Sequence, residues 1–296
     1  MKKLLVGVTT NETGADALAL ARLLTRNRGD SIVVCTVTSE SWSDAALRAV
    51  DSNYGEFLDG RAQLALDKAR EALEDLAGVR YLSRTDSDSA TCLLQVAHDE
   101  GCDAIVLGSS RSGASGRVTP GNFGSALLHP ANLPVVLAPR GYVSAAASEG
   151  VSRITFSFPG GSEDAFSAVR QSLQMARSLG VPLRLASFAV RDRQMFTAPV
   201  GLDAESILVA AWREQAEITL QQVRERMGEA GVAIEVCMID GESWEDVLLR
   251  VGWLPGELMA MGSRRLGLFT RLLLGSNASR IVRASPVPVI VLPNAD

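Results

Sequence analysis

The chain has 296 residues, 47% of them hydrophobic, so it is long enough for two ordinary domains that each bury a core. Its formal net charge of -5 excludes a general surface for nucleic acid or for an anionic membrane, because both would repel an acidic protein. No apolar run approaches the ~20 residues of a membrane helix, and the run after Lys2 and Lys3 is too short for a signal peptide. We therefore expect a cytoplasmic protein that binds neither nucleic acid nor membrane.

In the first half, short runs rich in Val, Ile and Leu alternate with longer segments of helical spacing, a pattern typical of a parallel sheet covered on both faces. Thr13 and Asp16 have the spacing of a capping box, which predicts a helix start near residue 13. Further helices are expected over residues 60–76, 90–100 and 122–129. Strands are expected over residues 4–8, 31–37, 80–84, 104–107 and 134–138.

The second half repeats this order of elements. Strands are expected over residues 154–158, 183–189, 234–238, 258–261 and 288–292. Because crossovers between parallel strands are right-handed in nearly all cases, each half should form an open α/β sheet wound in both directions. The predicted fold is thus two doubly wound parallel five-stranded sheets in tandem, with ligands bound beyond the carboxyl ends of the strands.

An internal repeat supports the division into two domains. Residues 107–111 return as 261–265 and residues 133–139 return as 287–293, so that Gly108 corresponds to Gly262 and Pro134 to Pro288, each 154 positions later. A small, polar segment between the copies reads as a linker. We therefore predict one domain over residues 1–140, a linker over 141–151 and a second domain over 152–296.

Each half has a glycine at the end of its fourth strand and another thirteen positions later, where its last helix begins. Glycine lets backbone N–H groups approach a ligand, a helix N-terminus favours anions, and an arginine in each loop could neutralise phosphate. The alternative is that the glycines end strands, Asn122 or Ser276 caps a helix and the arginines are solvated. The candidate ligand-binding residues are Gly108, Ser109, Arg111, Gly121 and Asn122 in the first half, and Gly262, Ser263, Arg265, Gly275 and Ser276 in the second.

A glycine pair, Gly160 and Gly161, follows Pro159 between the first strand and first helix of the second half. Its backbone N–H groups could receive an anion, so both glycines are added to the candidate site. A tight turn capped by Ser162 is the alternative interpretation.

Residue patterns typical of catalysis or metal binding are absent from the sequence. The two histidines, His98 and His129, have no partner at the spacing of a nucleophile or a metal ligand, and no Lys-bearing phosphate loop or G-x-S-x-G motif occurs. The four cysteines lie far apart without a C-x-x-C pair, which favours buried, reduced thiols. We therefore expect a protein that is not an enzyme and holds no metal.

The loops resemble those of the universal stress protein family, whose members carry G-x2-G-x9-G-[ST] after the fourth strand, then a helix and a last strand that begins Pro-Val. Gly108 with Gly121, and Gly262 with Gly275 and Ser276, match the first and last elements of this motif. The resemblance covers both halves. It implies the strand order 3-2-1-4-5, adenine-nucleotide binding in some members, and dimerisation through the last strands.

The sequence departs from the family pattern at positions that matter for ATP. Arg111 and Arg265 replace the second glycine of the motif, and Thr9 and Pro159 stand where ATP-binding members have an aspartate after the first strand. Asn122 replaces the motif's Ser or Thr. The resemblance thus implies a non-catalytic stress-response protein with degenerate loops for ATP, another adenine nucleotide or a different small phosphorylated ligand, with the second half the better candidate. A ligand-free scaffold and a weak ATP-hydrolysing enzyme are the alternatives.

The last strand of each half is apolar and would otherwise be an open sheet edge. We expect residues 134–138 and 288–292 to pair with each other across a pseudo-two-fold axis within the chain. Two such chains are then expected to form a homodimer.

Overall fold

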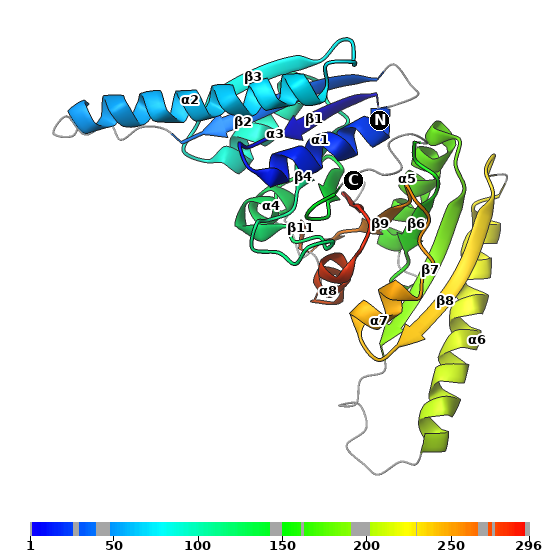
Figure 1. Cartoon of the computed structure of the whole chain (residues 1–296). Helices are drawn as coiled ribbons and strands as arrows, with labels where there is room; N and C mark the ends of the chain where they lie inside the picture. The colour runs from blue at the N-terminus through cyan, green and yellow to red at the C-terminus, as the bar shows by residue number, and fades with distance from the viewer. Residues whose placement is uncertain are drawn as a thin grey trace.

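One continuous ten-stranded sheet runs through both halves of the chain (Figure 1). The computed structural model describes residues 2–25, 30–39, 48–142, 150–160, 163–190, 202–228, 230–265, 272–273 and 276–293. The first half comprises β1 (Lys3–Gly7), α1 (Glu12–Thr25), β2 (Ser31–Thr38), α2 (Arg48–Ala72), β3 (Arg80–Thr85), α3 (Ser89–Asp99), β4 (Ala104–Gly108), α4 (Gly121–Leu128) and β5 (Val135–Ala138). The second half comprises β6 (Ile154–Ser157), α5 (Glu163–Leu179), β7 (Leu183–Val190), α6 (Leu202–Arg226), β8 (Ile234–Gly241), α7 (Trp244–Leu249), β9 (Leu258–Gly262), β10 (Arg264–Arg265), β11 (Leu272–Leu273), α8 (Ser276–Ala284) and β12 (Val289–Leu292).

The strand order confirms the predicted α/β fold. The first half runs β3-β2-β1-β4-β5 and the second β8-β7-β6-β9-β12, which is the order 3-2-1-4-5 twice. All pairs within a half are parallel, whereas β5 and β12 pair antiparallel, with Val136 opposite Ile290. The two five-stranded sheets are therefore joined into one through the two strands for which the sequence predicts mutual pairing.

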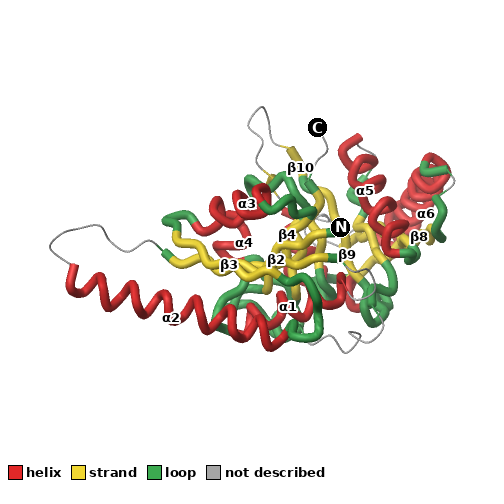
Figure 2. Tube along the Cα trace, turned by 90° about the horizontal axis from the view of Figure 1, so that it is seen from above, coloured by secondary structure: helices red, strands yellow, loops and turns green. Residues whose placement is uncertain are grey.

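Each face of the sheet packs against helices through an apolar layer. Because side chains alternate across a strand, Val136 and Ala138 face one layer, which they share with α1, α2, α5 and α6. Val135 and Leu137 face the other layer, which contains residues of α3, α4, α7 and α8. Figure 2 shows α1 and α2 on one side of β2, β3 and β4, and α3 on the other. Both faces are covered, as parallel sheets require.

Helix α2 begins at Arg48, well before the predicted start at residue 60. Its early part contains Gly55, and Tyr54 and Phe57 are exposed, so this stretch has neither the helix propensity nor the buried stripe on which the prediction relied. Figure 1 shows α2 extending beyond the sheet at one end of the molecule and α6 at the other. No helix among the described residues could span a membrane.

The predicted capping box at Thr13 and Asp16 is wrong. Helix α1 begins at Glu12, and the side chain of Asn11 accepts hydrogen bonds from the backbone N–H and the hydroxyl of Thr13, at 3.1 and 2.5 Å. The buried carboxylate of Asp16 instead accepts from the N–H of Gly141 at 3.0 Å. Asp16 thus joins α1 to the segment that follows β5. Residues 143–149 of the predicted linker lie outside the described residues.

Candidate ligand-binding sites

A pocket of about 460 Å³ opens at the carboxyl ends of β6, β7 and β9, beside the start of α8. We call it the second-half pocket. It lies where the winding of the sheet reverses, since β6 has β7 on one side and β9 on the other, and this is where ligands bind in such sheets. Its aromatic lining residues are Phe156, Phe158, Phe188, Trp212 and Trp244, and its polar ones are Ser157, Ser187, Ser263, Ser276 and Asn277.

Three predicted residues line this pocket, namely Gly262, Ser263 and Ser276. Gly160 follows Pro159, itself a lining residue, and has a φ of 132°, a conformation that favours glycine. The backbone of Arg265 lies in β10, opposite Leu272 in β11. Gly161, Gly275 and the side chain of Arg265 lie outside the described residues.

The serines that follow the two strand-end glycines make internal hydrogen bonds. Ser109 is 1% exposed, donates its hydroxyl to the carbonyl of Ala138 at 2.7 Å, and accepts from the N–H of Thr119 at 3.0 Å. Ser263 donates both its hydroxyl and its N–H to the carbonyl of Leu292, each at 3.0 Å. These hydroxyls fasten the loop to the last strand of each half, and their role in ligand binding stays a prediction.

The strand-end glycines are required by packing. A Cβ on Gly108 would lie 1.9 Å from the carbonyl oxygen of Thr13, and a Cβ on Gly262 would lie 2.9 Å from the Cβ of Ala168. The first helix of each half therefore crosses the end of the fourth strand at a distance that excludes a side chain. The sequence predicted a close backbone approach at these positions, but the approaching group is the protein's own helix.

The family model for the universal stress protein family matches residues 1–139 and 159–293, which is both halves. The chain belongs to the universal stress protein family. Universal stress proteins of Mycobacterium tuberculosis and Mycobacterium bovis are each 34% identical over 298 residues, covering 98% of this chain and 99% of their own length. The solved universal stress protein from Archaeoglobus fulgidus has the same fold, with a TM-score of 0.65 at 18% identity, covering 99% of this chain and 97% of its own.

In the first half of this universal stress protein, the loop between β4 and α4 closes on itself. The N–H of Ser110 donates to the carbonyl of Thr119 at 2.7 Å, and the guanidinium of Arg140 donates to the carbonyl of Gly113 at 2.7 Å. Gly121 has a φ of 66°, and a Cβ there would lie 2.8 Å from the Cβ of Ser110. Of the predicted residues, Gly121 thus serves the turn into α4.

Asn122 does not cap α4, contrary to one interpretation of the sequence. It is the second residue of the helix and is exposed, while Pro120 occupies the N-cap position and makes no side-chain capping hydrogen bond. The start of α4 therefore lacks the side-chain acceptor expected from the sequence.

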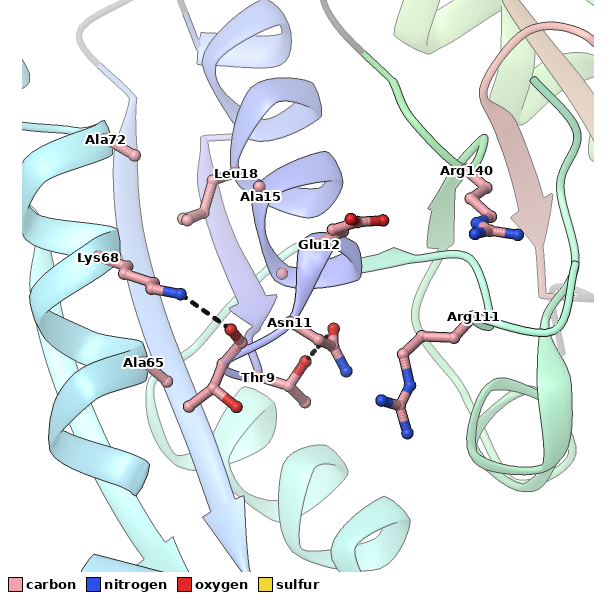
Figure 3. Close-up of a pocket in the computed structure, with 12 residues that line it drawn as sticks. Thr9, Asn11, Glu12, Ala15, Leu18, Ala65, Lys68, Ala72, Arg111 and Arg140 are labelled. Atoms are coloured by element: carbon pink, nitrogen blue, oxygen red, sulfur yellow. Dashed lines mark hydrogen bonds between the residues drawn. The ribbon is translucent and has the colours of Figure 1, made fainter. Parts of the chain in front are cut away.

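A second pocket, of about 600 Å³, lies against α1 and α2 (Figure 3). We call it the first-half pocket. Among the predicted site residues that the structure describes, only Arg111 lines it, together with Arg140 from the chain after β5 and Lys68 from α2. No sequence motif marks Lys68 or Arg140, because they belong to segments far apart in the chain that only the fold brings together.

A buried ionic cluster at the amino ends of β6, β7 and β9 was also missed. Glu257 has a fully buried side chain and pairs with Arg153 at 2.8 Å and with Arg184 at 2.6 Å. Arg184 further donates to the hydroxyl of Thr155 at 2.8 Å and lies over the ring of Trp253, 5.5 Å from its centroid. The cluster is at the opposite edge of the sheet from the second-half pocket, and none of its residues lines that pocket.

The cysteines occur as free thiols, with Cys35, Cys92 and Cys102 buried and Cys237 half-buried. Burial raises the pKa of the Cys35 thiol to about 12 and that of Cys102 to about 11, so both are protonated and unreactive at neutral pH. Within the described part of the chain, no group of three or more His, Cys, Asp and Glu side chains could hold a metal ion.

Proposed function

We propose that this universal stress protein is a non-catalytic regulatory protein whose second-half pocket binds an adenine nucleotide or another phosphorylated ligand with an aromatic ring. The observation that carries the proposal is the convergence of an aromatic wall and a helix N-terminus in one pocket at the reversal point of the sheet.

The aromatic wall suits a nucleobase. Phe158 and Phe188 come from the ends of neighbouring strands, and Trp212 and Trp244 come from two helices, so a planar ring would find apolar surface from several directions. Stacking of a base on an aromatic side chain contributes about 1–3 kcal/mol. A volume of about 460 Å³ lies within the usual range for pockets that hold small ligands.

The polar side of the pocket suits a phosphate. Ser276 and Asn277 begin α8, whose first turn contains no acidic residue, and the N–H groups of a helix start attract an anion. None of the described residues that line the pocket is Asp, Glu or His, so the lining itself contains no carboxylate that would repel the ligand. The same set offers no general base to activate water, which supports binding without hydrolysis.

Pro159 lines the pocket. It stands at the position where ATP-binding members of the family have an aspartate. Proline neither accepts a side-chain hydrogen bond nor donates from its backbone. The hydroxyls of Ser157 and Ser187, both lining residues, are the groups left to hold a ribose. This substitution also favours the second candidate function, a scaffold of the same fold that has lost its ligand.

Isothermal titration with ATP, ADP, cyclic AMP and adenosine tests the proposal, together with mass spectrometry of ligand that co-purifies with the full chain. We expect at least one adenine compound to bind and the substitution Phe188→Ala to weaken it about tenfold, through lost stacking. Phe123→Ala is the control, because Phe123 is an exposed aromatic residue on α4 in the other half. No heat, no thermal shift and no co-purified ligand would support the scaffold instead.

A further inference from the structure

The first-half pocket is a second cavity whose lining differs in chemistry from that of the second-half pocket. Its floor consists of the small or apolar residues Gly14, Ala15, Leu18, Ala65 and Ala72, from α1 and α2. Figure 3 shows Lys68 on α2 at one side of the start of α1, and Arg111 and Arg140 at the other side. The pocket thus crosses the first turns of α1, with an apolar middle and cations at both ends.

Positive charge is concentrated in this pocket although the whole chain is acidic. Lys68, Arg111 and Arg140 are cationic, and Glu12 is the one carboxylate among the described lining residues, whereas the chain carries a formal net charge of -5. The start of the 14-residue helix α1 adds the positive end of a helix dipole. An anion is therefore attracted to this cavity specifically and not to the protein surface in general.

Two of the cations are held in place before any ligand arrives. The ammonium of Lys68 donates to the carbonyl of Thr10 at 3.1 Å, and Arg61, two turns earlier on α2, donates to the Thr10 hydroxyl at 2.8 Å. Arg140 is fixed by its hydrogen bond of 2.7 Å to the carbonyl of Gly113. Such anchoring reduces the side-chain entropy that binding would otherwise cost.

Arg111 is the third cation of the first-half pocket, and its guanidinium is available to bind a ligand. It is exposed, and among the described residues its side chain has no hydrogen-bond or ion-pair partner. A guanidinium presents a planar fork of donors that matches a carboxylate or a phosphate. Arg111 is therefore the group in this pocket best suited to meet the head of an incoming anion.

The first-half and second-half pockets share one position, since Thr9 lines the first and the corresponding Pro159 lines the second, but the rest of their linings differ. Neither Gly108 nor Gly121 lines the first-half pocket, and it lies on the face of the sheet covered by α1 and α2. The internal repeat places Asn294 at the position that corresponds to Arg140, so the second half lacks this cation in its sequence. The arginine after the last strand is therefore specific to the first half.

We propose that the first-half pocket binds an amphipathic organic anion, in which a carboxylate or phosphate head meets Arg111 and Arg140 and a short apolar body lies over Ala15 and Leu18. A cavity of about 600 Å³ accommodates a ligand of this size. Burial of the ligand's apolar body against the apolar floor favours binding. The cations of the pocket favour a ligand with a negatively charged head.

Calorimetric titration of the full chain with octanoate and with octyl phosphate, at low salt, tests this proposal. Octylamine and octanol are the matched probes of opposite and zero charge. We expect both anions to bind, octylamine not to bind, and the affinity for the anions to fall as salt is raised. The anions should still bind when ATP is present in excess, since the two pockets are separate. Failure of both anions to bind the wild-type chain overturns the proposal, whatever the outcome for nucleotides.

Three substitutions at exposed positions locate the binding. Arg111→Gln should weaken octanoate binding about tenfold, Glu12→Gln should strengthen it because a repelling charge is lost, and Ala15→Trp should block the pocket. Arg170→Gln, at an exposed arginine of α5, is the control that removes the same charge elsewhere. If the first three variants keep their thermal stability and bind octanoate within about twofold of the wild type, the assignment to this pocket is wrong.

Discussion

The hydroxyl of Ser109 donates a hydrogen bond of 2.7 Å to the carbonyl oxygen of Ala138, and both residues are buried. The bond joins the loop after β4 to the end of β5, and the second half repeats it between Ser263 and Leu292 at 3.0 Å. Since a buried carbonyl left without its donor costs about 1–3 kcal/mol, we expect Ser109→Ala to lower the free energy of unfolding by this amount. Urea unfolding followed by circular dichroism measures it.

The same substitution should leave nucleotide binding in the second-half pocket unchanged, because Ser109 lies in the other half. Ser112→Ala is the control, since Ser112 is exposed and, among the described residues, its hydroxyl makes one hydrogen bond, of 3.0 Å, to the hydroxyl of Ser110. A Ser109→Ala variant as stable as the wild type would show that water replaces the hydroxyl without loss.

Gly108→Ala should destabilise the first half severely. The added Cβ would lie 1.9 Å from the carbonyl oxygen of Thr13, so α1 has to move away from β4, and overpacking of this kind costs about 1–3 kcal/mol or more. Gly262→Ala should cost less, because its Cβ would lie 2.9 Å from a methyl group rather than a backbone oxygen. Thermal unfolding of both variants gives the comparison.

Gly60→Ala provides the matched control for these glycine substitutions. Gly60 lies within α2 with nothing within 4 Å of an added Cβ, so alanine should stabilise the helix by up to about 1 kcal/mol. Equal effects of Gly60→Ala and Gly108→Ala would contradict the packing role assigned to Gly108.

The fold was predictable from the sequence because its signals are local and repeated. Strands such as β4 and β9 are continuous apolar runs that end in glycine, and the spacing of 154 positions relates Gly108 to Gly262 without any structure. Asp16 was misassigned because its partner, Gly141, is distant in sequence. A local capping pattern does not show that a carboxylate will instead accept a hydrogen bond from a residue distant in the sequence.

The candidate site was only partly predictable. Ser263 and Ser276 do line the second-half pocket, but the aromatic wall with Phe188 and Trp212 was not foreseen, since these residues come from β7 and α6 and have no motif in common. The first-half pocket depends on Lys68 and on Arg140 in the same way. Sequence spacing identifies residues that share a loop, whereas a pocket is assembled from separate elements.

A charge at the junction of the two halves should separate them. Val136 and Ile290 lie opposite each other in β5 and β12 and are fully buried, so Val136→Asp places an unpaired carboxylate in the core at a cost of several kcal/mol. We expect a larger radius of gyration by small-angle X-ray scattering with most of the helical circular dichroism retained. Leu254→Asp, at an exposed position, is the control, and unchanged compactness of Val136→Asp would contradict the expectation.

Glu257→Leu should be strongly destabilising, by about 3–5 kcal/mol, because it leaves Arg153 and Arg184 without the carboxylate they share. Glu235→Gln removes only the exposed partner of Arg153, at 3.2 Å, and should cost at most about 1 kcal/mol. Chemical denaturation of the two variants separates a buried pair from a surface pair. A small effect of Glu257→Leu would mean that the arginines reach water once the carboxylate is gone.

The stability of the first half should depend on pH through Asp16. Burial raises the pKa of its carboxyl above the ordinary value of 3.8, although the N–H groups of Gly141 and Tyr142 act in the opposite direction. The folded chain therefore holds the proton more tightly than the unfolded chain. The stabilisation is complete below pH 3.8 and is lost as the pH rises through the folded-state pKa.

Asp16→Asn should remove this dependence, since an amide oxygen still accepts from the N–H of Gly141 but does not titrate. We expect the difference in free energy of unfolding, variant minus wild type, to increase in favour of the variant as the pH is raised from 3.8 towards neutrality. Asp16→Ala, which offers no acceptor, should be about 1–3 kcal/mol less stable than Asp16→Asn at each pH. Urea titrations across this range measure the free energy of unfolding of all three proteins. A pH-independent difference between wild type and Asp16→Asn would show that the backbone hydrogen bonds fully offset the effect of burial on the pKa of the carboxyl.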